Sequence, residues 1–168
     1  MKSNITDLIF KTPEKWIHLR EIARKLRISP NSVRKYMGDL KKKGIIEQKK
    51  EGNMILFRAN FENEYYKHEK IIHNLSGIYK SGIIGVLRRF YNPSAIVLFG
   101  SYSRGEDTST SDIDIGIITT NKKKPNLKLF EKKLSRRIEL SLFTTNEVST
   151  EFFNNIINGI VLEGHLKK

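Results

Sequence analysis

The chain has 168 residues, of which 38% are hydrophobic and 29% charged, the proportions of a globular protein and not of a disordered one. It contains no cysteine, which excludes disulfides and thiolate metal sites and fits a reducing cytoplasm. No stretch has the apolar length of a signal peptide or a membrane helix, and the net charge of +13 is unevenly spread.

Most of the positive charge lies near the N-terminus. Residues 1–60 carry 15 basic and 6 acidic side chains, a net of +9, whereas residues 61–168 carry 16 and 12, a net of +4. A small, strongly basic segment predicts a polyanionic partner such as nucleic acid. The alternative is a solvated surface that serves solubility alone.

Two helical segments joined by a tight turn follow a short helix candidate at residues 4–11. Apolar residues in segment 19–26 recur at i, i+3, i+4 and i+7, which predicts an amphipathic helix. The next helix has Ser29 as its N-cap, Pro30 at its first position and Gly44 as its stop. This arrangement predicts a helix-turn-helix.

Two short apolar strands flank Gly52-Asn53 in "IIEQKKEGNMILFRA", which predicts a β-hairpin. Helices and hairpin together resemble the winged helix-turn-helix family over residues 1–60. The resemblance implies that the second helix enters the major groove of double-stranded DNA and that lysines of the helix end and hairpin contact phosphates. The expected DNA-binding residues are Asn31, Ser32, Arg34, Lys35, Lys41, Lys42, Lys49 and Lys50. A solvated face or a protein-binding surface is the alternative, and Trp16 is expected to anchor the core.

Residues 61–91 have helical periodicity, with apolar residues at spacings of three, four or seven. Because glycine weakens a helix interior, we expect a break near Ser76-Gly77. A connecting helix would then cover residues 61–76, and a second domain would cover residues 77–168. The apolar stripe of this segment could equally form the seam of a homodimer.

Strands and helices alternate from residue 95 onward, which predicts a small mixed-sheet domain and an α+β class for the whole chain. The expected strands are 95–99, 112–119, 138–144 and an edge strand within 159–164, and the expected helices are 127–137 and 150–158. The loop "NKKKPN" is expected to be solvated.

Two carboxylates stand out in the second of these strands, "DIDIGIIT". Strand side chains alternate between faces, so Asp112 and Asp114 would share the face opposite the isoleucines. Glu139 has the same orientation in the next strand, "IELSLF". Three carboxylates on one sheet face can hold two Mg²⁺ ions for attack on a phosphoryl group. Glu131, Glu106 and Asp107 are weaker candidates for the third position.

A phosphate site is expected beside these acids. Gly100-Ser101 comes directly after an apolar strand, where free backbone N–H groups and a hydroxyl can bind phosphate, and Arg104 could add a cation.

Gly100-Ser101, ten residues, then Asp112-x-Asp114 resembles the signature of the nucleotidyltransferase superfamily related to DNA polymerase β. The string "FGSYSRGEDTSTSDIDIGI" is similar to the minimal nucleotidyltransferases, the antitoxin-like partners of HEPN toxins. The resemblance covers residues 77–165. It implies that Gly100, Ser101 and Arg104 bind an NTP, with ATP the first candidate. It also implies that Asp112, Asp114 and Glu139 bind two Mg²⁺ ions. The family usually has Asp where this chain has Glu139.

Two functions follow from these resemblances. The first is Mg²⁺-dependent transfer of NMP to a hydroxyl of a partner protein, such as a HEPN-type toxin, or of an RNA 3′ end, in a cytoplasmic antitoxin that also binds its own promoter. The second is a catalytically inactive DNA-binding regulator whose C-terminal domain senses a nucleotide or binds a partner.

Overall fold

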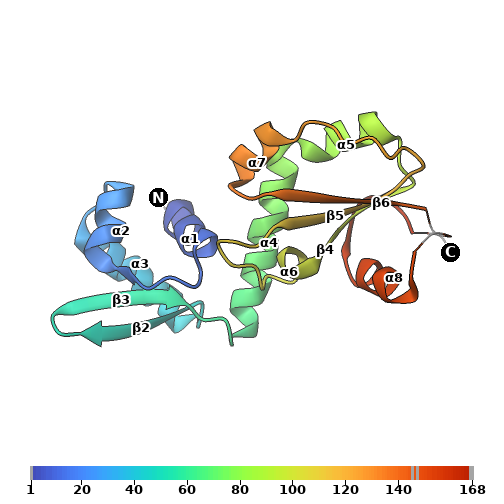
Figure 1. Ribbon diagram of the computed structural model, residues 1–168. Coiled ribbons are helices and arrows are strands. Elements are labelled where there is room, and N and C mark those ends of the chain that lie inside the picture. Colours follow the sequence, from blue (N-terminus) through green and yellow to red (C-terminus); the bar gives the residue numbers. More distant parts are fainter. Residues whose placement is uncertain (1, 145, 147, 167–168) are drawn as a thin grey trace. The chain divides into compact units, whose positions relative to one another are not determined.

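The computed structural model describes residues 2–144, 146 and 148–166 and divides into two compact units, Met1–His73 and Asn74–Lys168. Each unit combines helices with a sheet, which confirms the α+β class (Figure 1). Among the described residues, no helix is both long and apolar enough to cross a membrane.

The first unit contains the predicted helix pair and hairpin. Its elements before the long helix are α1 (Lys2–Lys11), β1 (Ile17–His18), α2 (Leu19–Leu26), α3 (Pro30–Lys42), β2 (Ile46–Glu51) and β3 (Met54–Ala59). Strands β2 and β3 pair antiparallel around Gly52-Asn53, as predicted. The two-residue strand β1, which periodicity could not indicate, pairs with β3 and makes the sheet order β1-β3-β2.

The core of the first unit forms where the apolar stripes of its helices meet. Ile22 of α2 and Val33 and Met37 of α3 are fully buried, together with Phe57 of the hairpin. The Ser29 hydroxyl accepts a hydrogen bond from the backbone N–H of Ser32, so the predicted N-cap starts α3.

Helix α4 (Glu64–Ser81) runs without interruption through Ser76-Gly77, so the break predicted there is wrong. The helix stops at Gly82, which has a φ of +83°, and α5 (Ile83–Tyr91) follows. A helix interior tolerates one glycine at a cost of about 1 kcal/mol, whereas a left-handed residue ends the helix. Residues 64–73 of α4 belong to the first unit and residues 74–81 to the second.

A four-stranded mixed sheet of order β6-β5-β4-β7 organises the second unit. The remaining elements are β4 (Ala95–Phe99), α6 (Gly100–Ser103), β5 (Ile113–Ile118), α7 (Lys128–Leu134), β6 (Ile138–Phe143), α8 (Thr150–Ile157) and β7 (Ile160–Gly164). Strands β5 and β6 are parallel, and β4 pairs antiparallel with both β5 and β7. The predicted edge strand is therefore confirmed as β7.

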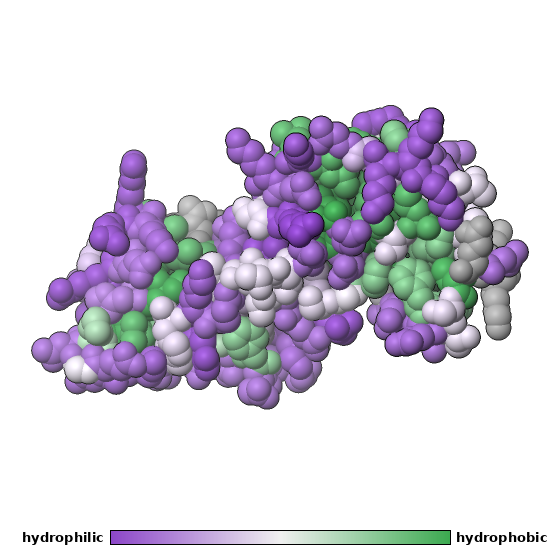
Figure 2. Space-filling model, viewed as in Figure 1, coloured by the Kyte–Doolittle hydropathy of each residue, from purple (hydrophilic) through white to green (hydrophobic). Residues whose placement is uncertain are grey.

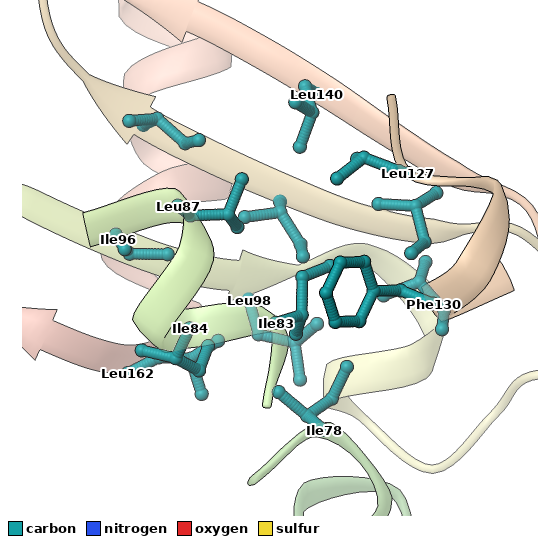
Figure 3. Packing of buried hydrophobic residues seen from close by; sticks show 14 of the residues in the cluster. Ile78, Ile83, Ile84, Leu87, Ile96, Leu98, Leu127, Phe130, Leu140 and Leu162 are labelled. Carbon is teal, nitrogen blue, oxygen red and sulfur yellow. The ribbon is translucent and has the colours of Figure 1, made fainter. Parts of the chain in front are cut away.

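The two faces of this sheet pack against different helices. One face joins Ile96, Leu98 and Ile115 to apolar residues of α4, α5 and α7, including Leu87 and Phe130 (Figure 3). The other face carries residues such as Val97 and Phe143 and is covered by Ile156 of α8. A Cβ at Gly116 would overlap the Ile156 side chain, so glycine there allows α8 to pack closely.

Figure 2 shows that most residues on the visible surface are hydrophilic, with hydrophobic ones between them. This is the distribution expected of a chain that is 29% charged.

Candidate functional site

Two of the three predicted acids are direct neighbours across the sheet. Asp114 of β5 and Glu139 of β6 are register partners in the parallel pair. Their sequence neighbours Ile113 and Ile138 are buried, so both acids lie on the face opposite the large apolar cluster. Asp112 lies one residue before β5 begins, in irregular structure. The alternation predicted for this strand therefore applies to Asp114 but does not fix Asp112.

The electrostatics of Asp114 show that the acids influence one another. Partial burial raises the pKa of the Asp114 carboxyl, and the charges of Asp112 and Glu139 raise it further. Arg104 opposes this shift. A carboxylate held near two others in a half-buried position is the environment that a bound cation would relieve.

Glu139 forms an ion pair with Lys124, a residue of the loop that the sequence analysis expects to be solvated. The Lys124 Nζ lies 3.4 Å from the Glu139 Oε1, and both side chains are more than half exposed. An exposed ion pair of this kind stabilises the fold by about 0–1 kcal/mol, so Glu139 can readily take another partner. Across residues 2–144, 146 and 148–166, no three His, Cys, Asp or Glu side chains are close enough together to hold one metal ion.

The donor chemistry at Asp112 and Asp114 fits a hard divalent cation, because Mg²⁺ takes carboxylate oxygens. The raised pKa of Asp114 also reflects unbalanced negative charge at this point. Glu139 would have to turn away from Lys124 to contribute a further oxygen. Its role as third ligand therefore stays a prediction.

The glycine-serine turn lies directly beside Asp114. Phe99, the residue before Gly100, is the register partner of Asp114 in the β4–β5 pair. Gly100 has a φ of +71°, and a Cβ built on it would overlap the Asp114 carboxylate. The backbone then forms the single turn α6, in which the Ser103 hydroxyl donates to the Gly100 carbonyl at 2.8 Å. The structure thus brings this turn and Asp114 together.

Arg104 lies just after this turn with an exposed side chain. Its Nε donates to the Glu106 Oε2 at 2.8 Å, and its charge lowers the pKa of Asp114. Glu106, one of the weaker candidates for the third carboxylate, is therefore occupied by an ion pair.

The loop between Arg104 and Asp112 is anchored by a buried polar network that the sequence did not indicate. Asp107 is completely buried, and its Oδ1 accepts a hydrogen bond of 2.7 Å from the Asn74 side chain. The same amide group donates to the Tyr102 carbonyl at 2.9 Å, and the Arg136 Nη2 lies 3.7 Å from the Asp107 Oδ2. No local signal marks Asn74 or Arg136, because their partners are far away in the sequence.

Glu131, the remaining candidate for the third carboxylate, also has a structural contact. Its Oε1 accepts the backbone N–H of Ile138 at 3.1 Å and so fixes the start of β6. In this structure Glu139 is the acid paired in register with Asp114.

The predicted DNA-binding residues of α3 form an exposed set. Asn31, Ser32, Arg34 and Lys35 are all exposed in the first two turns, while Val33 faces the core. The Ser32 hydroxyl lies 2.8 Å from the Ser29 hydroxyl, so this residue also serves the N-cap. The Arg34 Nη1 donates to the Asn31 Oδ1 at 3.4 Å.

The lysines predicted to contact phosphates lie at the end of α3 and on the hairpin. Lys41, Lys42 and Lys50 are exposed. Lys49 lies 4.5 Å from the centre of the Trp16 ring and forms an ion pair with Glu51.

Trp16 is half-buried and is not among the residues that form the core of the first unit, so the expectation that it anchors this core is not confirmed. The Arg58 guanidinium lies 4.7 Å from the centre of the Trp16 ring, and Lys49 lies near the same ring. Two cations within cation–π distance of one ring are held in place on the hairpin. Sequence reasoning missed Arg58, because its contact with Trp16 depends on the pairing of β1 with β3, which periodicity could not indicate.

Comparison with known families gives two matches. Residues 81–165 match the model of the family described as polymerase beta, nucleotidyltransferase, and this range contains every candidate active-site residue from Gly100 to Glu139. Residues 11–96 match the model of the penicillinase repressor family, a range that contains the helix pair and the hairpin. The matches overlap at residues 81–96. Searches of curated proteins and of solved structures gave no match.

Proposed function

Since the chain belongs to the polymerase beta nucleotidyltransferase family through residues 81–165 and to the penicillinase repressor family through residues 11–96, we propose that it transfers a nucleoside monophosphate from an NTP to a hydroxyl and also binds double-stranded DNA. The observation that supports the catalytic part is geometric: Asp114 of β5 is the register partner of Glu139 of β6, and its carboxylate lies against the Gly100 turn.

In this proposal the residues have separate tasks. Gly100 and Ser101 offer backbone and hydroxyl donors to the triphosphate, and Arg104 adds a cation. Asp112 and Asp114 would hold Mg²⁺, and Glu139 would join them after leaving Lys124. When bound, Mg²⁺ would supply charge neutralisation at the phosphates.

The proposed transfer exchanges one phosphorus–oxygen bond for another. The acceptor oxygen forms a bond to the α-phosphorus, and the bond from that phosphorus to the β-phosphate oxygen breaks. Pyrophosphate leaves with the electron pair of the broken bond. The hydroxyl proton passes to a carboxylate of the site, with Glu139 the exposed candidate, and then to solvent.

The repressor part rests on the exposed α3 residues and on the cationic hairpin. The resemblance of the second domain to antitoxin-like nucleotidyltransferases suggests that the chain represses its own promoter and modifies a HEPN-type partner. A catalytically inactive regulator is the second candidate, and one observation favours it. Glu139 stands where the family usually has Asp, and it is paired with Lys124.

Nucleotide binding tests the enzyme proposal without knowledge of the acceptor, because an enzyme of this kind must bind its NTP. We expect wild-type protein to bind ATP or another NTP more tightly with Mg²⁺ than with EDTA, and Asp112→Asn to lose at least tenfold in Mg²⁺-dependent affinity. Glu163→Gln is the matched control, because Glu163 lies on β7, the opposite edge strand from β6. It should bind nucleotide as wild type does.

The affinity for duplex DNA is measured on the same three proteins, and we expect both variants to bind duplex as tightly as wild type does. If no NTP binds in a Mg²⁺-dependent way while duplex binding is intact, the enzyme proposal is wrong and the regulator remains.

A further inference from the structure

The loop between α6 and β5 carries a candidate site residue near each end. Arg104, the candidate phosphate ligand, directly follows α6, and Asp112, a candidate Mg²⁺ ligand, directly precedes β5. Pairing of β5 with its neighbour β6 begins only at Ile113, so the sheet does not itself include Asp112. The placement of both residues around Asp114 therefore depends on how this loop is held.

The part of the loop next to Asp112 is a compact turn. The backbone N–H of Thr108 donates to the Ser111 hydroxyl at 2.9 Å, and the backbone N–H of Ser111 donates to the Thr108 carbonyl at 3.3 Å. Serine and threonine hydroxyls close turns by hydrogen bonds of this kind. Residues 108–111 are thus fixed relative to one another, and the residue before them, Asp107, determines where the turn lies.

Asp107 is anchored from two sides. Its side chain is completely buried, and its Oδ1 accepts a hydrogen bond from the Asn74 amide at 2.7 Å. The same amide of α4 donates to the Tyr102 carbonyl at 2.9 Å, so α4 holds the chain both before and after Arg104. On the other side, the Arg136 Nη2 lies 3.7 Å from the Asp107 Oδ2, and only 7% of the Arg136 side chain is exposed. The loop is therefore held between α4 and the residues that precede β6.

Stability alone does not account for this anchor. Taking a carboxylate and a guanidinium out of water costs free energy, and apolar side chains of similar volume often serve the fold as well or better. Apolar contacts, however, have no preferred direction, whereas hydrogen bonds fix both a distance and an angle. A buried charge in a loop that ends at a candidate metal ligand therefore indicates a need for accurate placement.

We propose that Asp107, held by Asn74 and Arg136, is a positioning residue for Asp112. By holding the loop, it keeps the Asp112 carboxylate beside Asp114, where the two carboxylates can share one cation. The inference rests on the proposed nucleotidyl transfer and extends it to side chains that act through the loop and not on the nucleotide. Loss of the anchor therefore weakens Mg²⁺-dependent nucleotide binding even where the fold remains stable.

The test uses the full chain and a fluorescent ATP analogue, and it measures the Mg²⁺ concentration that gives half-maximal nucleotide binding. Asp107→Leu/Arg136→Met replaces the buried pair with apolar side chains of similar volume and so keeps the fold, but it removes the acceptor of the Asn74 amide. We expect its Mg²⁺ midpoint to rise about tenfold, the scale on which groups behind metal ligands act. A merely structural anchor predicts the Mg²⁺ midpoint of wild type.

Two single variants separate the hydrogen bond from the charge. Asn74→Ala removes both amide hydrogen bonds and leaves the pair of Asp107 with Arg136, and it should raise the Mg²⁺ midpoint as the double variant does. Asp107→Asn retains an oxygen that can accept from Asn74, so its Mg²⁺ midpoint should stay close to that of wild type.

Leu87→Ala is the control for lost stability. Leu87 is fully buried in the apolar cluster on the sheet face opposite Asp114, so the variant opens a cavity there and leaves the anchor intact. Its Mg²⁺ midpoint should be that of wild type. A midpoint that rises in Leu87→Ala as much as in Asn74→Ala would overturn the proposal, because stability would then be the cause.

Hydrogen exchange reports on the loop directly, without nucleotide or Mg²⁺. We expect the backbone amides of residues 104–112 to exchange about tenfold faster in Asn74→Ala and in the double variant than in wild type or Leu87→Ala. Exchange and Mg²⁺ midpoints that stay at the wild-type values in both anchor variants would overturn the proposal. If wild type binds no nucleotide with Mg²⁺, the proposed nucleotidyl transfer is wrong, and the exchange rates alone decide whether Asp107 positions the loop.

Discussion

At the scale of single residues, Asp114 is held in a position that does not favour its charge. Its raised pKa means that the folded chain binds a proton at this carboxyl more readily than the unfolded chain does. The ionised form therefore lowers stability above the folded pKa, and this cost disappears as pH falls below the unfolded value of about 4.

Asp114→Asn should accordingly stabilise the protein without divalent ions at pH 7. Because the side chain is half-exposed, we expect a rise of about 1–3 °C in the unfolding midpoint, corresponding to less than about 1 kcal/mol. The difference should vanish near pH 3. Thermal unfolding followed by circular dichroism at both pH values measures it. A variant that is less stable than wild type at pH 7 would contradict the electrostatic account.

Gly100 is predicted to be irreplaceable for two separable reasons. Gly100→Ala forces an alanine into a left-handed backbone conformation and places its Cβ against the Asp114 carboxylate. We therefore expect the free energy of unfolding to fall by about 2–4 kcal/mol. Gly82→Ala has a φ of +83° with no atom within 4 Å of the new Cβ, so it should lose only about 1 kcal/mol. Urea unfolding compares the two. Equal losses would show that contact with Asp114 does not matter.

At the scale of elements, the Asp107 network joins α4, the loop before β5 and the residues before β6. Removing one member of a buried pair leaves the other uncompensated, so Asp107→Ala should cost about 3–5 kcal/mol. The double variant Asp107→Leu/Arg136→Met should be more stable than either single variant. Denaturant midpoints of all three proteins test this. Additive losses would mean that the two side chains do not interact.

The elements also show what the sequence could and could not predict. The hairpin at Gly52-Asn53, the Ser29 cap and the edge strand β7 follow from local turn chemistry and alternation, and all were predicted. The helix break at Gly82 was missed, because two nearby glycines differ only in backbone angle.

In the candidate site, too, features that follow from local pattern were predicted and contacts between distant segments were not. The strand pattern alone placed Asp114 and Glu139 on one face, and the parallel register confirms this. Contacts between distant segments could not be read from the sequence, and the Lys124–Glu139 pair and the Asn74–Asp107 bond are of that kind.

At the scale of the whole molecule, the net charge of +13 is concentrated in residues 1–60, which carry a net of +9. The first unit presents exposed basic side chains on α3 and on the hairpin. Duplex binding by this surface should depend steeply on salt, because each phosphate contact releases counterions.

Lys41→Ala/Lys42→Ala removes two exposed lysines at the end of α3. For duplex DNA we expect the log K against log salt slope to be shallower by about 1.8, since each phosphate contact contributes about 0.9, and the loss of affinity to be similar for all sequences. Arg34→Ala should instead reduce the preference among sequences, because its position suits contact with base edges. Fluorescence anisotropy over a salt series measures both effects. An unchanged slope in the double variant would place the duplex elsewhere on the protein.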